Sequence, residues 1–154
     1  MTDTDSTKLT TVRDILKGRP ETLASSSTAQ QAAKKLKKSS STSLLVVDAP
    51  GNPIGIITER DLVRKVCAFH KQGSDIIVKD IMTSPIITVN LNSTLKDAAN
   101  QMIQNKVRHL LVLDGGIARG VISANDFAIY LKRNVDLDQV NAAIIESLLN
   151  IKDK

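Results

Sequence analysis

The sequence repeats itself once, and this duplication constrains the fold more than any other feature of the chain. Aligned with itself, the chain shows two copies 66 residues apart, and the spacing falls to 65 after a turn in the middle of each copy. One deletion in that turn explains the change, because loops tolerate insertions and deletions. At least thirteen identical pairs occur in order, from Val12 with Val78 to Asp61 with Asp126. The sequence therefore predicts two copies of one structural unit.

Each copy shows the same order of expected elements. A short extended stretch comes first, followed by a helix that begins at Thr28 or Thr94, where Gln31 or Asp97 completes the spacing of a capping box. Two strands come next, the first of them apolar and β-branched, as in a strand buried on both faces. The strands are expected at 21–24, 44–47 and 54–57 in the first copy and at 86–89, 110–113 and 118–122 in the second.

A second helix closes each copy, beginning at Thr58 or Ser123. Its buried face is expected to carry Leu62, Val63, Val66 and Phe69 in the first copy and Phe127, Ala128, Ile129 and Leu131 in the second. The unit is thus β-α-β-β-α, and the fold class is α/β (α+β). Because one copy cannot cover both faces of its sheet, we expect the two to pack around a pseudo-two-fold axis. The expected boundaries are repeat 1 at 8–70, a linker at 71–77, repeat 2 at 78–134 and an amphipathic C-terminal helix at 136–151.

Composition excludes several classes of protein. Apolar residues make up 42% of the chain and charged residues 24%, a balance typical of a globular protein. No apolar run approaches the roughly 18 residues that a membrane-spanning helix needs. Cys67 is the single cysteine, so an internal disulfide is impossible, and a reducing, cytoplasmic location is expected. The net charge of +5 favours contact with anions, and it includes the run Lys34–Lys38, which is expected to be a solvated helix face with Leu36 turned inward.

The same short motif stands at the junction between the last strand and the last helix of each copy. Residues 55–61 and 120–126 both read Gly, two apolar residues, Thr or Ser, two variable residues and Asp. The hydroxyl lies at a helix N-cap, where free N–H groups attract phosphate, and the carboxylate one turn later can accept hydrogen bonds from vicinal hydroxyls. The glycine leaves space for a flat base. The motif is also simply a good helix start, which needs no ligand.

The order of motifs resembles that of the cystathionine-β-synthase (CBS) domain. The resemblance rests on Val-Lys-Asp-Ile-Met (78–82), Arg-His-Leu-Leu-Val-Leu-Asp (108–114) and Gly-Val-Ile-Ser-Ala-Asn-Asp (120–126), with a second set from Val-Arg-Asp-Ile-Leu (12–16) to Asp61. It covers roughly residues 8–134. Two such repeats form a Bateman module, and this implies two clefts between the repeats that bind adenosine-containing ligands.

The resemblance also implies roles for individual residues. Asp61 and Asp126 would hold the ribose, with Thr58 and Ser123 near ribose and phosphate. Ile56 and Val121 would contact adenine. Arg108, with His109 beside it, would meet phosphate. Each cleft would be completed by the other repeat, the Asp126 cleft by residues 11–16 (Thr11 to Leu16) and 41–43 (including Thr42 and Ser43), and the Asp61 cleft by residues 77–82 (Ile77 to Met82) and 107–109 (Val107 to His109).

The two copies differ before the apolar strand. Repeat 2 has Arg108 and His109 where repeat 1 has Thr42 and Ser43. A cation beside a phosphate is a charge-assisted contact worth about 1.5–3 kcal/mol. From the sequence we therefore expect the Asp126 cleft to be the better nucleotide site.

No arrangement of residues in the sequence points to catalysis. The chain has two histidines, His70 and His109, and lacks zinc-protease, phosphate-loop and serine-nucleophile motifs. We expect a regulatory protein, not an enzyme, with no required cofactor and no metal site, that binds AMP, ADP, ATP or S-adenosylmethionine. It would act on a partner protein or through its own homodimer. Alternative functions are nucleic-acid binding, motivated by the positive charge, and a ligand-free structural dimer.

Overall fold

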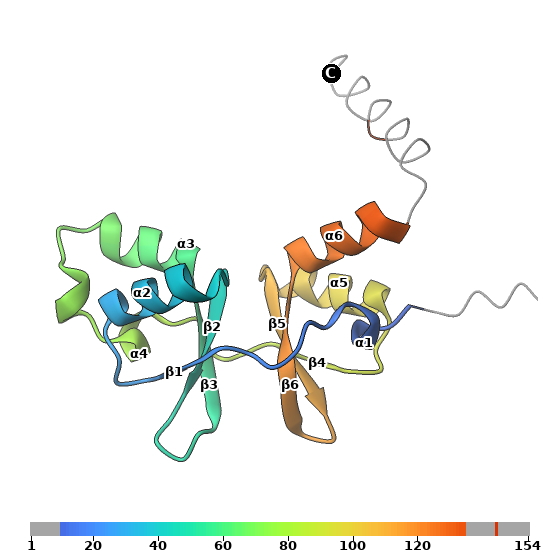
Figure 1. Ribbon diagram of the computed structural model, residues 1–154, viewed down its shortest axis with the longest axis horizontal. Coiled ribbons are helices and arrows are strands. Elements are labelled where there is room, and N and C mark those ends of the chain that lie inside the picture. Colours follow the sequence, from blue (N-terminus) through green and yellow to red (C-terminus); the bar gives the residue numbers. More distant parts are fainter. Residues whose placement is uncertain (1–9, 135–143, 145–154) are drawn as a thin grey trace, which may run out of the picture.

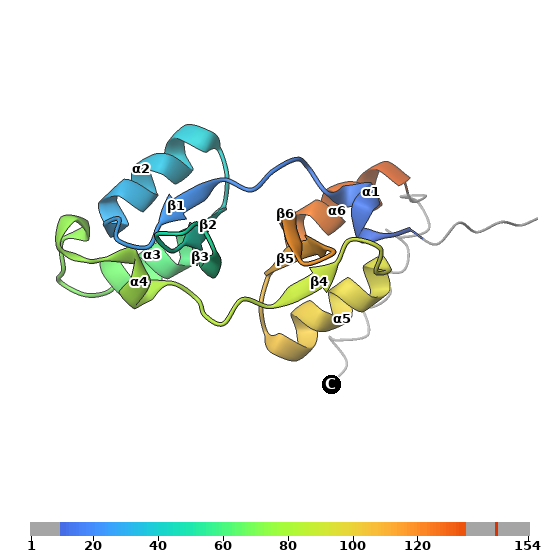
Figure 2. The same cartoon turned by 90° about the horizontal axis from the view of Figure 1, so that it is seen from below.

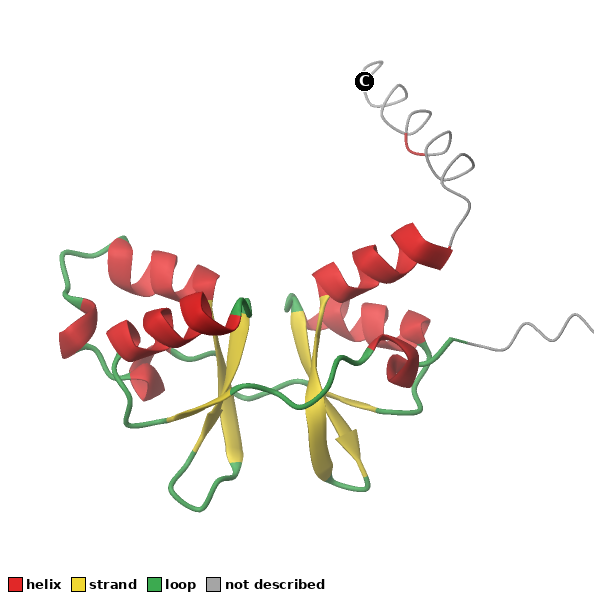
Figure 3. Cartoon of the chain, viewed as in Figure 1, coloured by secondary structure: helices red, strands yellow, loops and turns green. Residues whose placement is uncertain are grey.

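The computed structural model describes residues 10–134 and residue 144 of the 154-residue chain. It is a mixed α+β fold in which two three-stranded sheets face each other and the helices cover their outer faces (Figures 1 and 3). The predicted fold class is confirmed. The predicted C-terminal helix at 136–151 lies outside the described residues, apart from Ile144.

The two sheets have the same topology. In each, the first strand is parallel to the central strand and the third is antiparallel to it. Repeat 1 contains α1 (Val12–Ile15), β1 (Thr22–Ala24), α2 (Ala29–Ser39), β2 (Ser43–Val47), β3 (Pro53–Thr58), α3 (Glu59–Leu62) and a π-helical turn, η1 (Val63–Cys67). A 3-10 turn, η2 (Gly73–Asp75), leads to repeat 2, which contains α4 (Val78–Ile81), β4 (Thr88–Asn90), α5 (Leu95–Asn105), β5 (His109–Asp114), β6 (Ile117–Ser123) and α6 (Ala124–Asn134).

The long helix of each repeat begins at the cap that the sequence predicts. Thr28 Oγ1 accepts the Gln31 N–H at 3.1 Å, and Gln31 Oε1 accepts the Thr28 N–H at 2.9 Å. Thr94 Oγ1 accepts the Asp97 N–H at 3.1 Å. Each such cap stabilises its helix by about 1 kcal/mol. These local bonds explain why the helix starts are predictable from spacing alone.

The short leading helices α1 and α4 are exchanged between the repeats. Figure 2 shows α1 beside α5 and α6, and α4 beside α2 and α3. Val12 and Ile15 of α1 lie in the core of repeat 2, and Val78 and Ile81 of α4 lie in the core of repeat 1. Each repeat therefore completes its hydrophobic core with a helix from the other.

Equivalent backbone hydrogen bonds hold the two exchanged helices. The Val12 N–H donates to the Ser93 carbonyl at 2.9 Å, and the Val78 N–H donates to the Ser27 carbonyl at 2.8 Å. Both members of one bond are 66 residues from their counterparts in the other. After each leading helix, a crossing segment (residues 16–21 or 82–87) returns to the first strand of its own copy. The crossing segments thus pass from one repeat to the other.

The inner faces of the two sheets meet in a third, smaller cluster. Leu45 and Ile56 from repeat 1 pack there with Leu111 from repeat 2. This contact fixes the strand ends of the two repeats near each other, and the clefts described below lie at those ends.

The predicted buried face of the second helix is wrong in part. Val66 is buried and Leu62 partly buried, but Val63 and Phe69 are 60% and 59% exposed. For Phe69 the reason is the π-helical turn η1, which precedes it, adds a residue to the turn and so shifts the side chains that follow around the axis. In α6, Phe127 packs against the core of repeat 2, but Ala128 and Leu131 are exposed.

The lysine-rich run lies on α2, with Leu36 buried and Lys34, Lys37 and Lys38 exposed. Lys35 is 3.9 Å from the Glu21 carboxylate. The interpretation of this run as a solvated helix face is confirmed. Within the described ranges, no helix has the length and apolar character needed to cross a membrane.

Candidate functional site

Two clefts lie where the strand ends of one repeat face those of the other. The larger, the Asp61 cleft, has a volume of about 480 Å³, and the smaller, the Asp126 cleft, about 270 Å³. The Asp61 cleft is formed by residues 42, 56, 58–61, 64–65, 83, 85–87, 106–109 and 123–125. The Asp126 cleft is formed by residues 17–21, 40–43, 45, 109, 121, 123 and 125–126.

Asp61 is the buried polar group of the larger cleft. Its side chain lies one turn into α3, and the residue is 8% exposed. Oδ2 accepts the Thr58 backbone N–H and the Thr58 hydroxyl, each at 3.0 Å, while the Asp61 N–H donates to Thr58 Oγ1 at 3.1 Å. This capping box fixes the carboxylate at the junction of β3 and α3.

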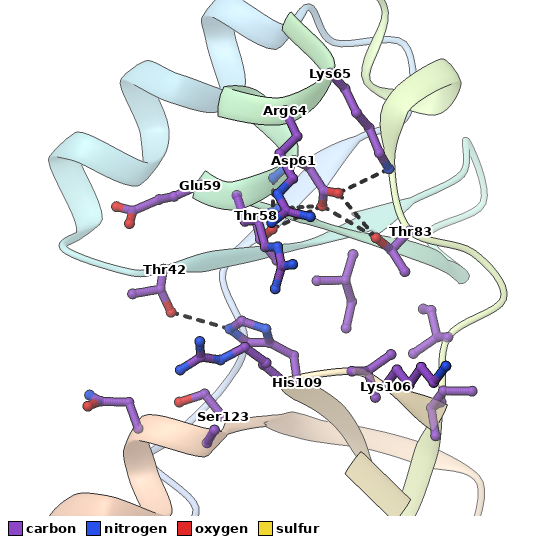
Figure 4. A pocket seen from close by; sticks show the side chains of 18 of the residues that line it. Thr42, Thr58, Glu59, Asp61, Arg64, Lys65, Thr83, Lys106, His109 and Ser123 are labelled. Atoms are coloured by element: carbon purple, nitrogen blue, oxygen red, sulfur yellow. Dashed lines mark hydrogen bonds and ion pairs between the residues drawn. The ribbon is translucent and has the colours of Figure 1, made fainter. Parts of the chain in front are cut away.

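The other carboxylate oxygen of Asp61 faces two side chains in Figure 4. Lys65 Nζ lies 3.0 Å from Oδ1, and the Thr83 hydroxyl donates to Oδ1 at 3.3 Å. Lys65 Nζ also donates to the Ile81 carbonyl at 2.7 Å. The charge of Asp61 is thus balanced by Lys65, while Oδ1 stays directed at the cleft wall that Thr83 forms.

Asp126 is held in the same way by Ser123. Asp126 Oδ2 accepts the Ser123 N–H at 2.8 Å and the Ser123 hydroxyl at 3.0 Å. The counter-ion of Asp126 comes from another segment than that of Asp61. Lys17 Nζ, in the crossing segment, lies 3.6 Å from Asp126 Oδ1. The two carboxylates therefore share a cap but differ in their counter-ions.

His109 and Thr42 form a wall that the two clefts share. Both residues line both clefts, and His109 Nε2 lies 3.3 Å from Thr42 Oγ1 (Figure 4). Burial lowers the pKa of His109, and Arg108 lowers it further, while Asp126 and Asp61 act in the opposite direction. His109 is therefore mostly neutral at pH 7, since its ordinary pKa is about 6.5.

The structure places Arg108 in the Asp61 cleft, to which the family resemblance assigned residues 107–109. Arg108 lines the Asp61 cleft and is not part of the Asp126 cleft. The sequence-based preference for the Asp126 cleft rested on this cation, and its position in the Asp61 cleft removes that support. Arg108 directly precedes β5 and lines the cleft that also contains Thr58 and Asp61 of repeat 1.

Most predicted site residues line a cleft, but four do not. Ile56, Thr58, Asp61, Val107 and Arg108 line the Asp61 cleft; Ser43, Val121 and Asp126 line the Asp126 cleft; Thr42, His109 and Ser123 line both. Thr11, Leu16, Ile77 and Met82, which were predicted to complete the clefts, are not among the lining residues. These four belong to the exchanged helices or their caps, where Leu16 and Met82 pack against the two cores.

Glycine in the repeated motif makes room for the chain itself. A Cβ on Gly55 would lie within 2.8 Å of Met82 Cγ, and one on Gly120 would lie 2.7 Å from the Gly18 carbonyl oxygen. The space that the sequence suggested for a base is filled by the crossing segments. Gly120 thus allows a close approach of backbone to backbone, whereas Gly55 makes room mainly for the Met82 side chain.

Sequence reasoning missed the part of each crossing segment that lines a cleft. Thr83 and Pro85 border the Asp61 cleft, and Lys17 and Arg19 border the Asp126 cleft. The 66-residue spacing relates Lys17 to Thr83, so the repeat could have predicted that both crossing segments line a cleft at equivalent positions. Arg64, Lys65 and Lys106 were also missed, because which way an exposed lysine or arginine points is not fixed by local pattern.

Comparison with known proteins agrees with this geometry. The family model of the CBS domain matches residues 12–68 and again 78–133, and the chain therefore belongs to the CBS domain family as a pair of such domains. A CBS-domain containing protein of Agrobacterium tumefaciens has a TM-score of 0.73 at 28% identity, covering 80% of this chain and 94% of that one. The hexameric CBS-CP12 protein from bloom-forming cyanobacteria has a TM-score of 0.76 at 25% identity, covering 94% and 88%.

Curated relatives match over shorter stretches. An uncharacterized protein of Methanopyrus kandleri is 39% identical over 85 residues, which is 54% of this chain and 43% of that protein. The CBS domain-containing mitochondrial protein of Arabidopsis thaliana is 34% identical over 107 residues, covering 65% and 52%. The chain thus spans about half the length of these two relatives. CBS domain pairs are generally regulatory ligand-binding modules.

Proposed function

We propose that this CBS domain pair is a regulatory sensor that binds an adenosine nucleotide in the Asp61 cleft. The observation that carries the proposal is a buried carboxylate fixed by a capping box in a cleft that also presents apolar side chains and several cations. Nucleotides need these three surfaces together: a flat apolar wall for the base, an acceptor for the ribose hydroxyls and positive charge for phosphate.

In the proposed complex, adenine lies against Ile56, Ile86 and Val107, which come from both repeats. Asp61 Oδ1 accepts hydrogen bonds from the ribose hydroxyls. Lys65 Nζ, which lies 3.0 Å from this oxygen, contacts the same hydroxyls. Arg108 contacts phosphate.

The proposed output follows from the construction of the cleft. A ligand that touches both repeats favours one relative orientation of the two, and a partner protein or a second copy of the chain responds to that orientation. No catalytic step is part of the proposal, nor is a cofactor beyond the ligand. We place the protein in the cytoplasm.

Thermal unfolding with adenosine, AMP, ADP, ATP and S-adenosylmethionine tests the proposal. A ligand at about 100 times its Kd stabilises the folded state by about 2.7 kcal/mol. For a chain of this size that raises Tm by roughly 5–11 °C. GTP serves as the control for general anion effects. A Tm unchanged by every adenosine ligand would refute the proposal, and retention on nucleic acid at about 50 mM salt would favour the alternative of nucleic-acid binding.

Nucleotide affinity is also expected to rise as pH falls, because His109 lines the cleft. Burial lowers the pKa of His109 in the free protein, and a bound phosphate raises it again. Binding therefore takes up a proton, and affinity decreases as pH rises through the His109 pKa of the complex. Calorimetric titration of ATP between about pH 5.5 and 8 measures this slope.

The phosphates of ATP titrate in the same range, so the comparison that counts is with His109→Asn. This variant is expected to retain only the slope due to ATP itself. His70→Asn is the matched control, since His70 is exposed and outside both clefts. Identical slopes in the wild type and His109→Asn would disprove proton uptake by His109.

A further inference from the structure

The two clefts carry different charge although they descend from one repeated unit. The Asp61 cleft is lined by five cationic side chains and two carboxylates, Glu59 and Asp61. The Asp126 cleft is lined by Lys17 and Arg19 with the carboxylates Glu21 and Asp126. With His109 neutral, the Asp61 cleft has a surplus of three positive charges and the Asp126 cleft has no surplus.

The surplus lies on two opposite sides of the cleft. Arg60 and Arg64 extend from α3 and η1 of repeat 1, whereas Lys106 and Arg108 precede β5 of repeat 2. Lys65, the fifth cation, is already engaged by Asp61 and the Ile81 carbonyl. Four cations therefore remain to contact a ligand, and they approach it from both repeats.

The internal duplication shows that these cations are specific to one cleft. At the pseudo-symmetric positions, the other cleft's side has neutral residues: Ser40 for Lys106, Thr42 for Arg108, Asn125 for Arg60 and Ile129 for Arg64. These four positions differ in the same direction, whereas in the crossing segments the Asp126 cleft has the cations, with Lys17 and Arg19 at the positions of Thr83 and Pro85. The carboxylates Glu21 and Asp126 balance those two charges. A general surplus of surface charge would place cations on both sides alike.

Like charges gathered around one cavity repel each other, and a polyanion between them removes that repulsion. A single phosphate is small beside cations that come from two repeats, whereas a chain of two or three phosphates can reach both sides. Charge-assisted contacts of this kind are the stronger hydrogen bonds of proteins.

We propose that the Asp61 cleft selects adenosine ligands carrying two or three phosphates and that the Asp126 cleft takes no such ligand. The proposal rests on the proposed function and specifies the ligand of that site. The Asp126 cleft is smaller, its charges balance, and Lys17 lies 3.6 Å from Asp126. One polyphosphate nucleotide per chain is the consequence.

Calorimetric titration with AMP, ADP and ATP, and with inorganic tripolyphosphate, tests the selection. ATP is expected to bind at least about tenfold more tightly than AMP, at one site per chain, with ADP between them. Tripolyphosphate is expected to compete with ATP, and the advantage of ATP over AMP is expected to shrink as salt is raised. Equal affinity for AMP and ATP, or two ATP sites per chain, overturns the proposal.

Two variants separate the cleft from overall charge. Arg108→Gln is expected to reduce ATP affinity about tenfold and AMP affinity less, so that discrimination falls. Lys34→Gln, which removes one exposed charge on α2 outside both clefts, is expected to leave both affinities unchanged. If the two variants lose discrimination equally, the selection arises from net charge and the proposed cleft is wrong.

The titrations also distinguish this proposal from the proposed function. If tripolyphosphate binds and adenosine adds no affinity, the cation cluster is correct and nucleotide recognition is refuted. If AMP binds as tightly as ATP, nucleotide recognition stands and polyphosphate selection fails. If neither nucleotides nor tripolyphosphate bind, both are overturned.

Discussion

A fragment spanning residues 17–84 is expected to fold cooperatively, whereas a fragment of the same length spanning residues 10–77 is not. The two differ mainly in their leading helix: the first contains α4 and the second contains α1. Repeat 1 needs α4, because Val78 and Ile81 are buried in its core. The sequence repeat and the structural half are thus different segments of the chain.

The size of the effect follows from the buried side chains. Full burial of Val or Ile stabilises by about 1.5–3 kcal/mol each, so removing α4 costs about 3–6 kcal/mol. A core of this size rarely supplies more than about 3–5 kcal/mol in total. In residues 10–77, the apolar side chains Val12 and Ile15 also lose the core of repeat 2 in which they are buried.

Far-UV circular dichroism and urea unfolding of the two fragments measure the difference. A cooperative transition for residues 17–84 and a broad or absent one for 10–77 is the expected result. The variant Val78→Ala in the fragment of residues 17–84 is expected to lower the free energy of unfolding of that fragment, because this side chain is fully buried. Equal cooperativity of the two fragments would contradict the exchange of helices.

The largest expected effect on ligand binding is that of Asp61→Asn, which should weaken ATP binding about 10- to 100-fold. The carboxylate accepts the ribose hydroxyls in the proposed complex, and a hydrogen bond to a charged group contributes about 1.5–3 kcal/mol. Asparagine keeps one acceptor and the size of the side chain but loses the charge that Lys65 balances.

Asp126→Asn is the matched control, because Asp126 has the same cap in the other cleft. We expect it to change ATP affinity less than about threefold. This ranking is the reverse of the one that the sequence suggests, since Arg108 lines the Asp61 cleft. Calorimetric titration of the two variants decides between the rankings, and a larger loss in Asp126→Asn would restore the sequence-based one.

Both variants also remove part of a capping box, so each is expected to lose about 1 kcal/mol of stability. Asp61→Asn is expected to lose more, because Asp61 is 8% exposed and also contacts Lys65 and Thr83. Affinity is therefore measured well below each variant's Tm. A variant that is folded by circular dichroism and yet does not bind separates binding from stability.

Much of the fold was predictable because its signals are local. Capping boxes join residues three apart, and buried strands show as short apolar runs, so the starts of α2 and α5 and the positions of β2 and β5 follow from the sequence. The π-helical turn η1 was not predictable, because its pattern of apolar residues also fits a regular helix.

The sequence by itself determined that the chain is a duplicated unit and that Asp61 and Asp126 are held at equivalent helix starts. Only the tertiary structure decided which segments complete each core and how charge is divided between the clefts. Leading helices α1 and α4 are exchanged, and Arg108 faces the Asp61 cleft, because packing joins residues far apart in the chain. A duplicated sequence pattern is the same whether a leading helix packs in its own repeat or in the other, because both cores present equivalent surfaces. Only the path of the crossing segments determines in which core each helix packs.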